Sequence, residues 1–204
     1  MMLIGISVSY GQIPAEVTDV MNRCRTAMNN PNGLEYEMDV KAGMGPVSMN
    51  MHFIIANKGE LNRTQFTIKI LGKEVSSESG FDGTQTWEID RSPKGDTITI
   101  TPGKNMKKSK GDLQLDLDKQ YKKAKIKLKD GYYVITFSEP IDSSNEVKSI
   151  TIKISEKNYT VREVRSGARG AKVTMTITKI RVGLKDSHFK LNLAQYPNAV
   201  VIRK

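Results

Sequence analysis

The sequence has very few of the side chains that catalytic and metal sites use most often. Its 204 residues contain one cysteine, Cys24, and two histidines, so no internal disulfide can form and no zinc-ligand spacing is present. Neither a Gly-x-Ser-x-Gly nor a His-Glu-x-x-His motif occurs. We therefore expect a protein that is not an enzyme and that carries no metal and no cofactor.

Aromatic residues are also scarce, at 6%, whereas 32 Lys and Arg stand against 22 Asp and Glu. The resulting net charge of +10 would attract nucleic acid, anionic lipid head groups or an acidic protein surface. Proteins that bind single-stranded nucleic acid stack bases on exposed aromatic side chains, and here the aromatic residues fall mostly on apolar strand faces. The sequence thus argues against nucleic acid and favours a membrane or an acidic partner, with a merely solvated lysine face as the alternative.

No apolar run reaches the roughly 20 residues that are needed to span a bilayer. Residues 1–10 are apolar and fit the hydrophobic region of a secretory signal, although the charged region that normally precedes it is missing. We predict a truncated signal peptide over residues 1–12, one domain over residues 13–204, export to the periplasm and a monomeric state. An ordinary β-strand is the alternative for the first ten residues.

Hydrophobic periodicity predicts one helix followed by many short strands. Apolar residues at three- and four-residue steps predict an amphipathic helix over 13–28, which ends before Pro31 and Gly33. From Leu34 to Ile177 the period is two in about ten segments, with hairpin signals such as Asp130-Gly131. This pattern is typical of an antiparallel sandwich or barrel. Residues 104–129 interrupt it, with a helical turn expected over 118–123.

The interrupting segment concentrates the positive charge, with ten lysines against three aspartates. We expect it to lie at the rim of an apolar sheet face and to steer the protein toward anionic head groups or an acidic acceptor. The candidates for that contact are Lys107, Lys108, Lys122 and Lys123.

Methionine is the excess that points to a ligand. Four of the ten methionines lie in the first predicted hairpin, where unbranched side chains can adapt to an apolar ligand of variable shape, although an ordinary core is the simpler interpretation. A sheet with so many apolar alternations and one long helix must close on itself or leave a concave apolar surface.

Three segments resemble one family of exported proteins. They are the D-G-x-x-x-W hairpin within residues 81–87, the strand pair S-I-T-I-K-I-S-E-K-N-Y-T-V-R-E-V within residues 149–164, and F-x-L-N-x-x-x-Y-P-x-A-x-V-I over residues 189–202. Together they resemble the periplasmic outer-membrane lipoprotein carrier proteins, which are called LolA-like. No arginine of this chain matches with assurance the one that holds the covering helices shut in that family.

The resemblance implies a mainly β, α+β fold: a strongly bent antiparallel sheet forming a half-barrel, covered by an N-terminal helix and a short central helical segment. It also implies a concave apolar face that holds acyl chains, an inner-membrane release complex that supplies lipoprotein cargo, and an outer-membrane acceptor that receives it. The residues that we expect to line the lipid cavity are apolar or aromatic side chains of the predicted strands: Met49, Met51, Phe53, Phe66, Trp87, Tyr133 and Phe137. The alternative is an exported half-barrel sensor or scaffold that binds an acidic protein or an envelope polymer without transporting lipid.

Overall fold

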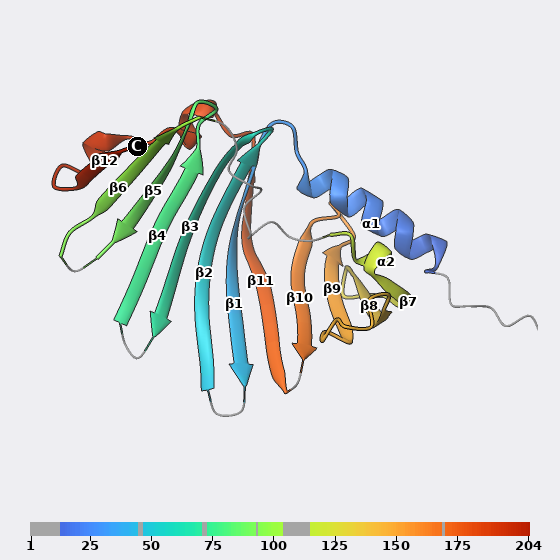
Figure 1. Cartoon of the computed structure of the whole chain (residues 1–204). Coiled ribbons are helices and arrows are strands. Elements are labelled where there is room, and N and C mark those ends of the chain that lie inside the picture. The colour runs from blue at the N-terminus through green and yellow to red at the C-terminus, as the bar shows by residue number, and fades with distance from the viewer. Residues whose placement is uncertain (1–12, 45–46, 71–72, 93, 104–114, 169) are drawn as a thin grey trace, which may run out of the picture.

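The computed structural model describes residues 13–204 apart from 45–46, 71–72, 93, 104–114 and 169, so the predicted signal peptide lies outside the described residues. Within the described part, one curled sheet of twelve strands forms most of the molecule, with helix α1 beside it (Figure 1). The mainly β half-barrel expected from the sequence is confirmed. The strands are β1 (Leu34–Met44), β2 (Val47–Lys58), β3 (Leu61–Ile70), β4 (Lys73–Phe81), β5 (Gln85–Arg91), β6 (Thr97–Pro102), β7 (Tyr121–Lys129), β8 (Tyr132–Pro140), β9 (Ser149–Ser155), β10 (Val161–Ala168), β11 (Ala171–Val182) and β12 (Val200–Arg203).

Helix α1 (Ala15–Met28) forms where the sequence predicts it, two residues later at its start. Its side chains at Val17, Val20, Met21 and Cys24 are buried, which is the spacing of one helix face. The residue before the helix is Pro14, whose fixed φ suits a helix start. The short helix α2 (Leu117–Gln120) comes shortly after residues 104–114, which the structure does not describe. It corresponds to the short central helical segment that the resemblance implies.

The sheet consists of two antiparallel meanders that are joined side by side. Strands β1 to β6 form one and strands β7 to β11 form the other, and the seam between them is the antiparallel pairing of β1 with β11. Strand β12 adds to the outer edge of β6 in a parallel orientation. The order β12-β6-β5-β4-β3-β2-β1-β11-β10-β9-β8-β7 therefore leaves β12 and β7 as the two edge strands among the described residues.

Strand register defines two faces of the sheet, which we call the helix face and the opposite face. The helix face is the one on which α1 packs, at the β7–β10 end of the sheet (Figure 1). One row of directly paired residues on this face is apolar across nine consecutive strands, from β4 to β7 in sheet order. Its members are Val75, Ile68, Met51, Val40, Met175, Val164, Ile152, Ile135 and Ile126.

The opposite face has its own smaller core under residues 183–199, which we call the C-terminal segment. This segment includes two 3-10 helices, η1 (Asp186–Phe189) and η2 (Leu193–Gln195). Trp87 packs under it, and its indole Nε1 donates a hydrogen bond to the carbonyl oxygen of Phe189 at 3.3 Å. The side chains of this second core are Trp87, Ile89, Ile98 and Ile100, packed against Leu191, Leu193, Tyr196 and Ala199.

Register explains why Trp87 belongs to the second core. Trp87 is paired with Gly80, and Gly80 with Arg63 of β3. Because Arg63 and Phe66 are three residues apart on one strand, their side chains point to opposite faces. The prediction that Trp87 shares a cavity with Phe53 and Phe66 is therefore wrong.

Candidate functional site

The most distinctive feature of the helix face is an apolar area that α1 does not cover. Along the nine-strand row, Ile135 and Ile152 are fully buried next to α1, whereas Val75 at the other end is 50% exposed. Between these two ends the exposure varies, since Val40 and Ile68 are buried and Met51 and Met175 are half-buried. We call the part of this face that lies away from α1 the apolar strip, in which Ile68 is buried and the other members are half-buried or exposed. Its side chains are Met49, Met51, Phe53, Phe66, Ile68, Val75, Val173 and Met175.

Four of the predicted lipid-cavity residues come together on the apolar strip. Met51, Phe53 and Phe66 are half-buried, and Met49 is 39% exposed. The rings of Phe53 and Phe66 are directly paired across β2 and β3, with centroids 5.0 Å apart. An aromatic pair flanked by methionines makes a surface that is apolar, partly open and adaptable in shape.

The other three predicted residues lie elsewhere. Phe137 is fully buried in the core beside α1, with its ring 6.1 Å from that of Tyr121, so it is structural. Tyr133 is half-buried on the helix face and stacks on Tyr159, with the ring centroids 6.0 Å apart. Trp87 lies on the opposite face, as described above.

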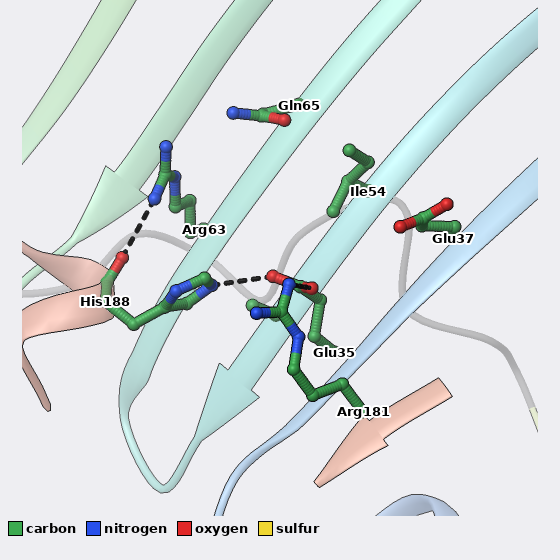
Figure 2. Close-up of a pocket in the computed structure, with 8 residues that line it drawn as sticks. Glu35, Glu37, Ile54, Arg63, Gln65, Arg181 and His188 are labelled. Atoms are coloured by element: carbon green, nitrogen blue, oxygen red, sulfur yellow. Dashed lines mark hydrogen bonds and ion pairs between the residues drawn. The ribbon is translucent and has the colours of Figure 1, made fainter. Parts of the chain in front are cut away.

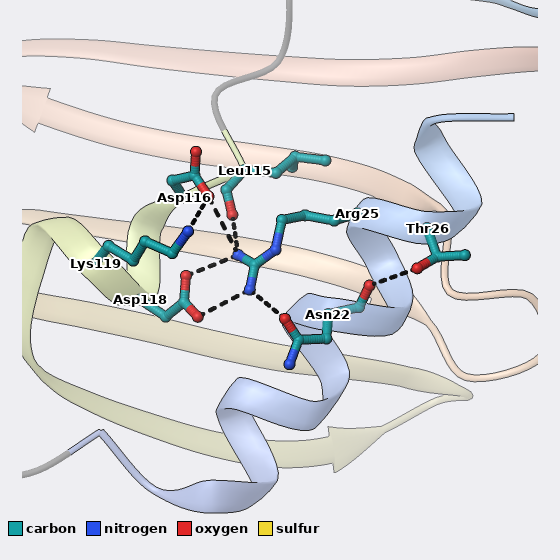
Figure 3. Close-up of polar contacts among 7 residues, drawn as sticks. All are labelled: Asn22, Arg25, Thr26, Leu115, Asp116, Asp118 and Lys119. Carbon is teal, nitrogen blue, oxygen red and sulfur yellow. Dashed lines mark hydrogen bonds and ion pairs between the residues drawn. The ribbon is translucent and has the colours of Figure 1, made fainter.

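An arginine on α1 fastens the helix to α2 (Figure 3). Arg25 donates to both carboxylate oxygens of Asp118, at 2.8 and 3.0 Å, and to the carbonyl oxygen of Leu115 at 2.9 Å. A further bond to the Asn22 side chain at 2.7 Å fixes the guanidinium on its own helix. Asp118 is only 6% exposed, and the pKa of Arg25 is raised mainly because of its hydrogen bond to this carboxylate. We call this set of contacts the Arg25 latch.

A second, more exposed contact holds α1 to the strands. Arg23 donates to the Tyr159 hydroxyl at 3.1 Å and lies 5.2 Å from the centre of that ring. Between the two arginines, Cys24 is completely buried, and this burial raises the pKa of its thiol to about 12. A thiol that keeps its proton is neither a nucleophile nor a metal ligand.

The structure describes two of the four lysines that we expected to contact a membrane or a partner. Lys107 and Lys108 lie outside the described residues, and Lys122 is exposed at the start of β7. Lys123 pairs with Glu139 at 2.5 Å and begins an alternation of exposed lysines on one face of this edge strand. We call the set the lysine row: Lys123, Lys125, Lys127 and Lys129.

Sequence reasoning missed two parts of this site. The Arg25 latch was missed because an arginine in the last turn of a helix is an ordinary solvated residue, and nothing local ties it to Asp118. The contribution of Val173 and Met175 was missed because it depends on the pairing of β1 with β11. Alternation had already placed both residues on one strand face, so only their neighbours were unknown.

Comparison with known proteins gives structural likenesses only. No family model matches the chain, and no curated protein matches its sequence. Solved structures that are similar include the MucA/MucB complex of Pseudomonas aeruginosa, at 10% identity and a TM-score of 0.49 over 87% of this chain. LprF from Mycobacterium bovis matches at 12% identity and a TM-score of 0.49, over 86% of this chain and 96% of that chain.

A third match is the LolA superfamily protein from Nitrosomonas europaea, at 10% identity and a TM-score of 0.39. It covers 86% of this chain and 97% of that one. The chain spans 62% of the length of the MucA/MucB chain that it matches. At these identities and scores the likeness concerns the arrangement of the sheet, and function must be inferred from this chain's own side chains.

No group of three or more His, Cys, Asp or Glu side chains among the described residues is placed to hold a metal ion. Likewise, neither α1 nor α2 has the length and apolar character that a membrane-crossing helix requires.

Proposed function

We propose that the protein is a non-enzymatic carrier or binder of lipidated cargo that holds acyl chains along the apolar strip. The observation that carries this proposal is the nine-strand apolar row, which continues from the core under α1 to the half-buried Met51 and Met175 and to Val75, which is exposed. An acyl chain lying on the strip would continue the core that α1 already covers. Contiguous exposed apolar surface of this kind marks a binding site in soluble proteins.

The affinity of such a site would come from apolar area. Each methylene removed from water contributes about 0.8 kcal/mol, so a chain of ordinary lipid length gains enough to offset its lost freedom. Methionine side chains at Met49, Met51 and Met175 can repack around chains of different length. The strip thus fits a class of cargo that shares acyl chains and differs in the attached protein.

The same proposal includes export of the protein to the periplasm and transfer of its lipidated cargo to an acceptor. In the periplasm the cargo would come from an inner-membrane release complex and pass to an outer-membrane acceptor. The lysine row supports transient contact with anionic head groups, because each lysine near such a surface contributes about 1 kcal/mol. Contact of this strength brings the protein to a membrane without anchoring it.

The test is displacement of a fluorescent fatty acid, combined with native mass spectrometry of the purified protein. Met49→Asp with Val75→Asp should weaken fatty-acid binding by at least about tenfold, since two charges would lie on the strip. Both positions are substantially exposed, so the fold should tolerate the change. The matched control is Ile141→Asp, which alters an exposed apolar residue outside the strip, at 56% exposure. Absence of lipid or acyl-peptide binding in both assays would refute the carrier function.

A second candidate function is an exported sensor or scaffold that binds an acidic protein or polymer. The lysine row on the edge strand favours it, because a regular row of exposed cations matches an extended acidic chain. This function requires no acyl-chain binding. Partner binding that survives Met49→Asp with Val75→Asp would favour the scaffold over the carrier.

A further inference from the structure

The opposite face contains a cavity of about 450 Å³ between the C-terminal segment and strands β3 and β11. It lies on the other side of the sheet from the apolar strip. All of its ionisable lining side chains are basic, and the remaining polar ones are hydroxyl or amide groups. The basic residues are Arg63, Arg181, Lys185, His188 and Lys190.

Buried carboxylates hold the two arginines in place beside this cavity, and Figure 2, a close-up of the neighbouring pocket, shows one of them, Glu35, next to Arg181 and His188. Glu78, which is 2% exposed, accepts from Arg63 Nε at 2.8 Å and lies 2.7 Å from Nη2. Glu35, which is 5% exposed, pairs with Arg181 and lies 2.7 Å from His188 Nε2. These pairs orient the guanidinium groups before any ligand arrives.

Hydrogen-bonding capacity remains after these pairs are formed. A guanidinium has five N–H donors, and Arg63 uses three of them, the third on the carbonyl oxygen of His188 at 3.1 Å. Among the described residues, Arg181 donates to Glu35 through Nη2. Further N–H groups of both arginines therefore remain for a ligand beside the cavity.

Positive charge also remains beside the cavity after the neighbouring carboxylates have been paired. The nearby Asp186 is already paired with Lys58 at 2.7 Å, and the pKa of Asp186 is lowered mainly by this hydrogen bond, with a smaller contribution from Lys190. Within the described residues, neither Lys185 nor Lys190 forms an ion pair of its own. Two ammonium groups thus border a cavity whose carboxylate neighbours are already paired.

We propose that this cavity binds a phosphate group. Fixed arginine N–H donors match phosphate oxygens in a forked geometry, and the two lysines supply the charge for a dianion. The volume is within the range of small-molecule sites, so the phosphate could be that of a soluble phosphoester or of a lipid head group. Because the site is on the opposite face, it does not depend on acyl-chain binding.

The experiment is calorimetric titration with inorganic phosphate and with glycerol 3-phosphate at constant ionic strength. The parent protein should bind both in a saturable manner. Lys185→Gln with Lys190→Gln should weaken binding by about tenfold or more, since two charged donors are lost. The matched control is Lys125→Gln with Lys127→Gln, which removes the same charge from the edge strand β7 and should leave phosphate binding unchanged.

A vesicle-binding experiment distinguishes a lipid head group from a soluble phosphoester as the source of the phosphate. Sedimentation uses phosphatidylcholine vesicles with and without phosphatidic acid. A loss of vesicle binding in the Lys185 and Lys190 variant, together with competition by free phosphate, indicates a lipid head group. Phosphate titration without any vesicle effect indicates a soluble phosphoester. Absence of saturable phosphate binding in the parent, or equal weakening in both double variants, would overturn the proposal, whatever the fatty-acid assay shows.

Discussion

The position of α1 depends strongly on one side chain, Arg25. Arg25→Ala would leave Asp118 buried without its partner, so we expect the free energy of unfolding to fall by about 2–3 kcal/mol. Arg23→Ala is the control, because its ion pair with Asp19 and its hydrogen bond to Tyr159 are both exposed to solvent, and exposed ion pairs contribute less than about 1 kcal/mol. Urea denaturation measures both. Equal losses for the two variants would show that the Arg25 latch is no stronger than a surface ion pair.

The thiol of Cys24 provides a pH test of the packing under α1. Its pKa is raised to about 12 by burial, against an ordinary value of 9.0, so the folded protein keeps the thiol proton where the unfolded chain loses it. Stability from this group is therefore complete below pH 9 and falls as the pH rises from 9 toward 12. Iodoacetamide at pH 8 should label Cys24 only after denaturant is added. Rapid labelling of the native protein would mean that α1 opens readily.

At the scale of elements, the contact of β4 with β5 leaves no room for a side chain at Gly80. A Cβ added at Gly80 would lie 2.5 Å from Trp87 Cζ2 and 2.9 Å from the Asn62 carbonyl oxygen. Gly80→Ala should therefore displace the indole and destabilise the protein by about 1–3 kcal/mol. Tryptophan fluorescence should shift to longer wavelength, because Trp87 is the only tryptophan. Ser79→Ala, one residue earlier in β4, is the control and should leave the spectrum unchanged.

The elements that the sequence could predict are those with strong local patterns. Helix α1 and strands such as β2 and β8 follow from apolar periodicity alone. Strand β4 was missed because it is rich in Ser and Glu, which have little strand preference, and because apolar residues do not alternate along it. It forms because β3 and β5 pair with it on both sides. Strand β12 has β-branched residues but only four positions and no alternation of apolar and polar side chains, so periodicity did not identify it.

Over the whole molecule, the charge is arranged so that one edge of the sheet carries the lysine row. Charge reversal of Lys123, Lys125 and Lys127 to Glu should abolish association with anionic vesicles at low salt, since attraction would become repulsion. In the parent, association should weaken steeply as salt is raised, because charges are screened over about 8 Å at physiological ionic strength. Vesicle sedimentation across a salt series measures both effects.

The control for that experiment reverses three exposed lysines that are scattered over the molecule, Lys94, Lys157 and Lys172. It matches the change in net charge without touching the edge strand. If this control loses vesicle binding as completely as the β7 variant, association follows net charge and the lysine row has no special role.

The sequence could not show which residues of different strands share one face of the folded sheet. Alternation assigns residues to two faces within a strand, but it does not say which face of one strand meets which face of the next. Trp87 was therefore grouped with Phe53, although the register sends it to the opposite face. The motif residues at 189–199 gave no hint of this either, since their contact with Trp87 spans more than half the chain.

The seam between β1 and β11 also governs how the chain must fold. Strand β1 pairs with β11, so this seam cannot close until the chain has been synthesised as far as Val182. Pairings this distant make folding slow, on a timescale of milliseconds to seconds. Meanwhile the β1–β2 hairpin would present an unpaired edge and its methionine-rich face to solvent. A binding chaperone acting on the nascent chain would therefore find its target in residues 34–58.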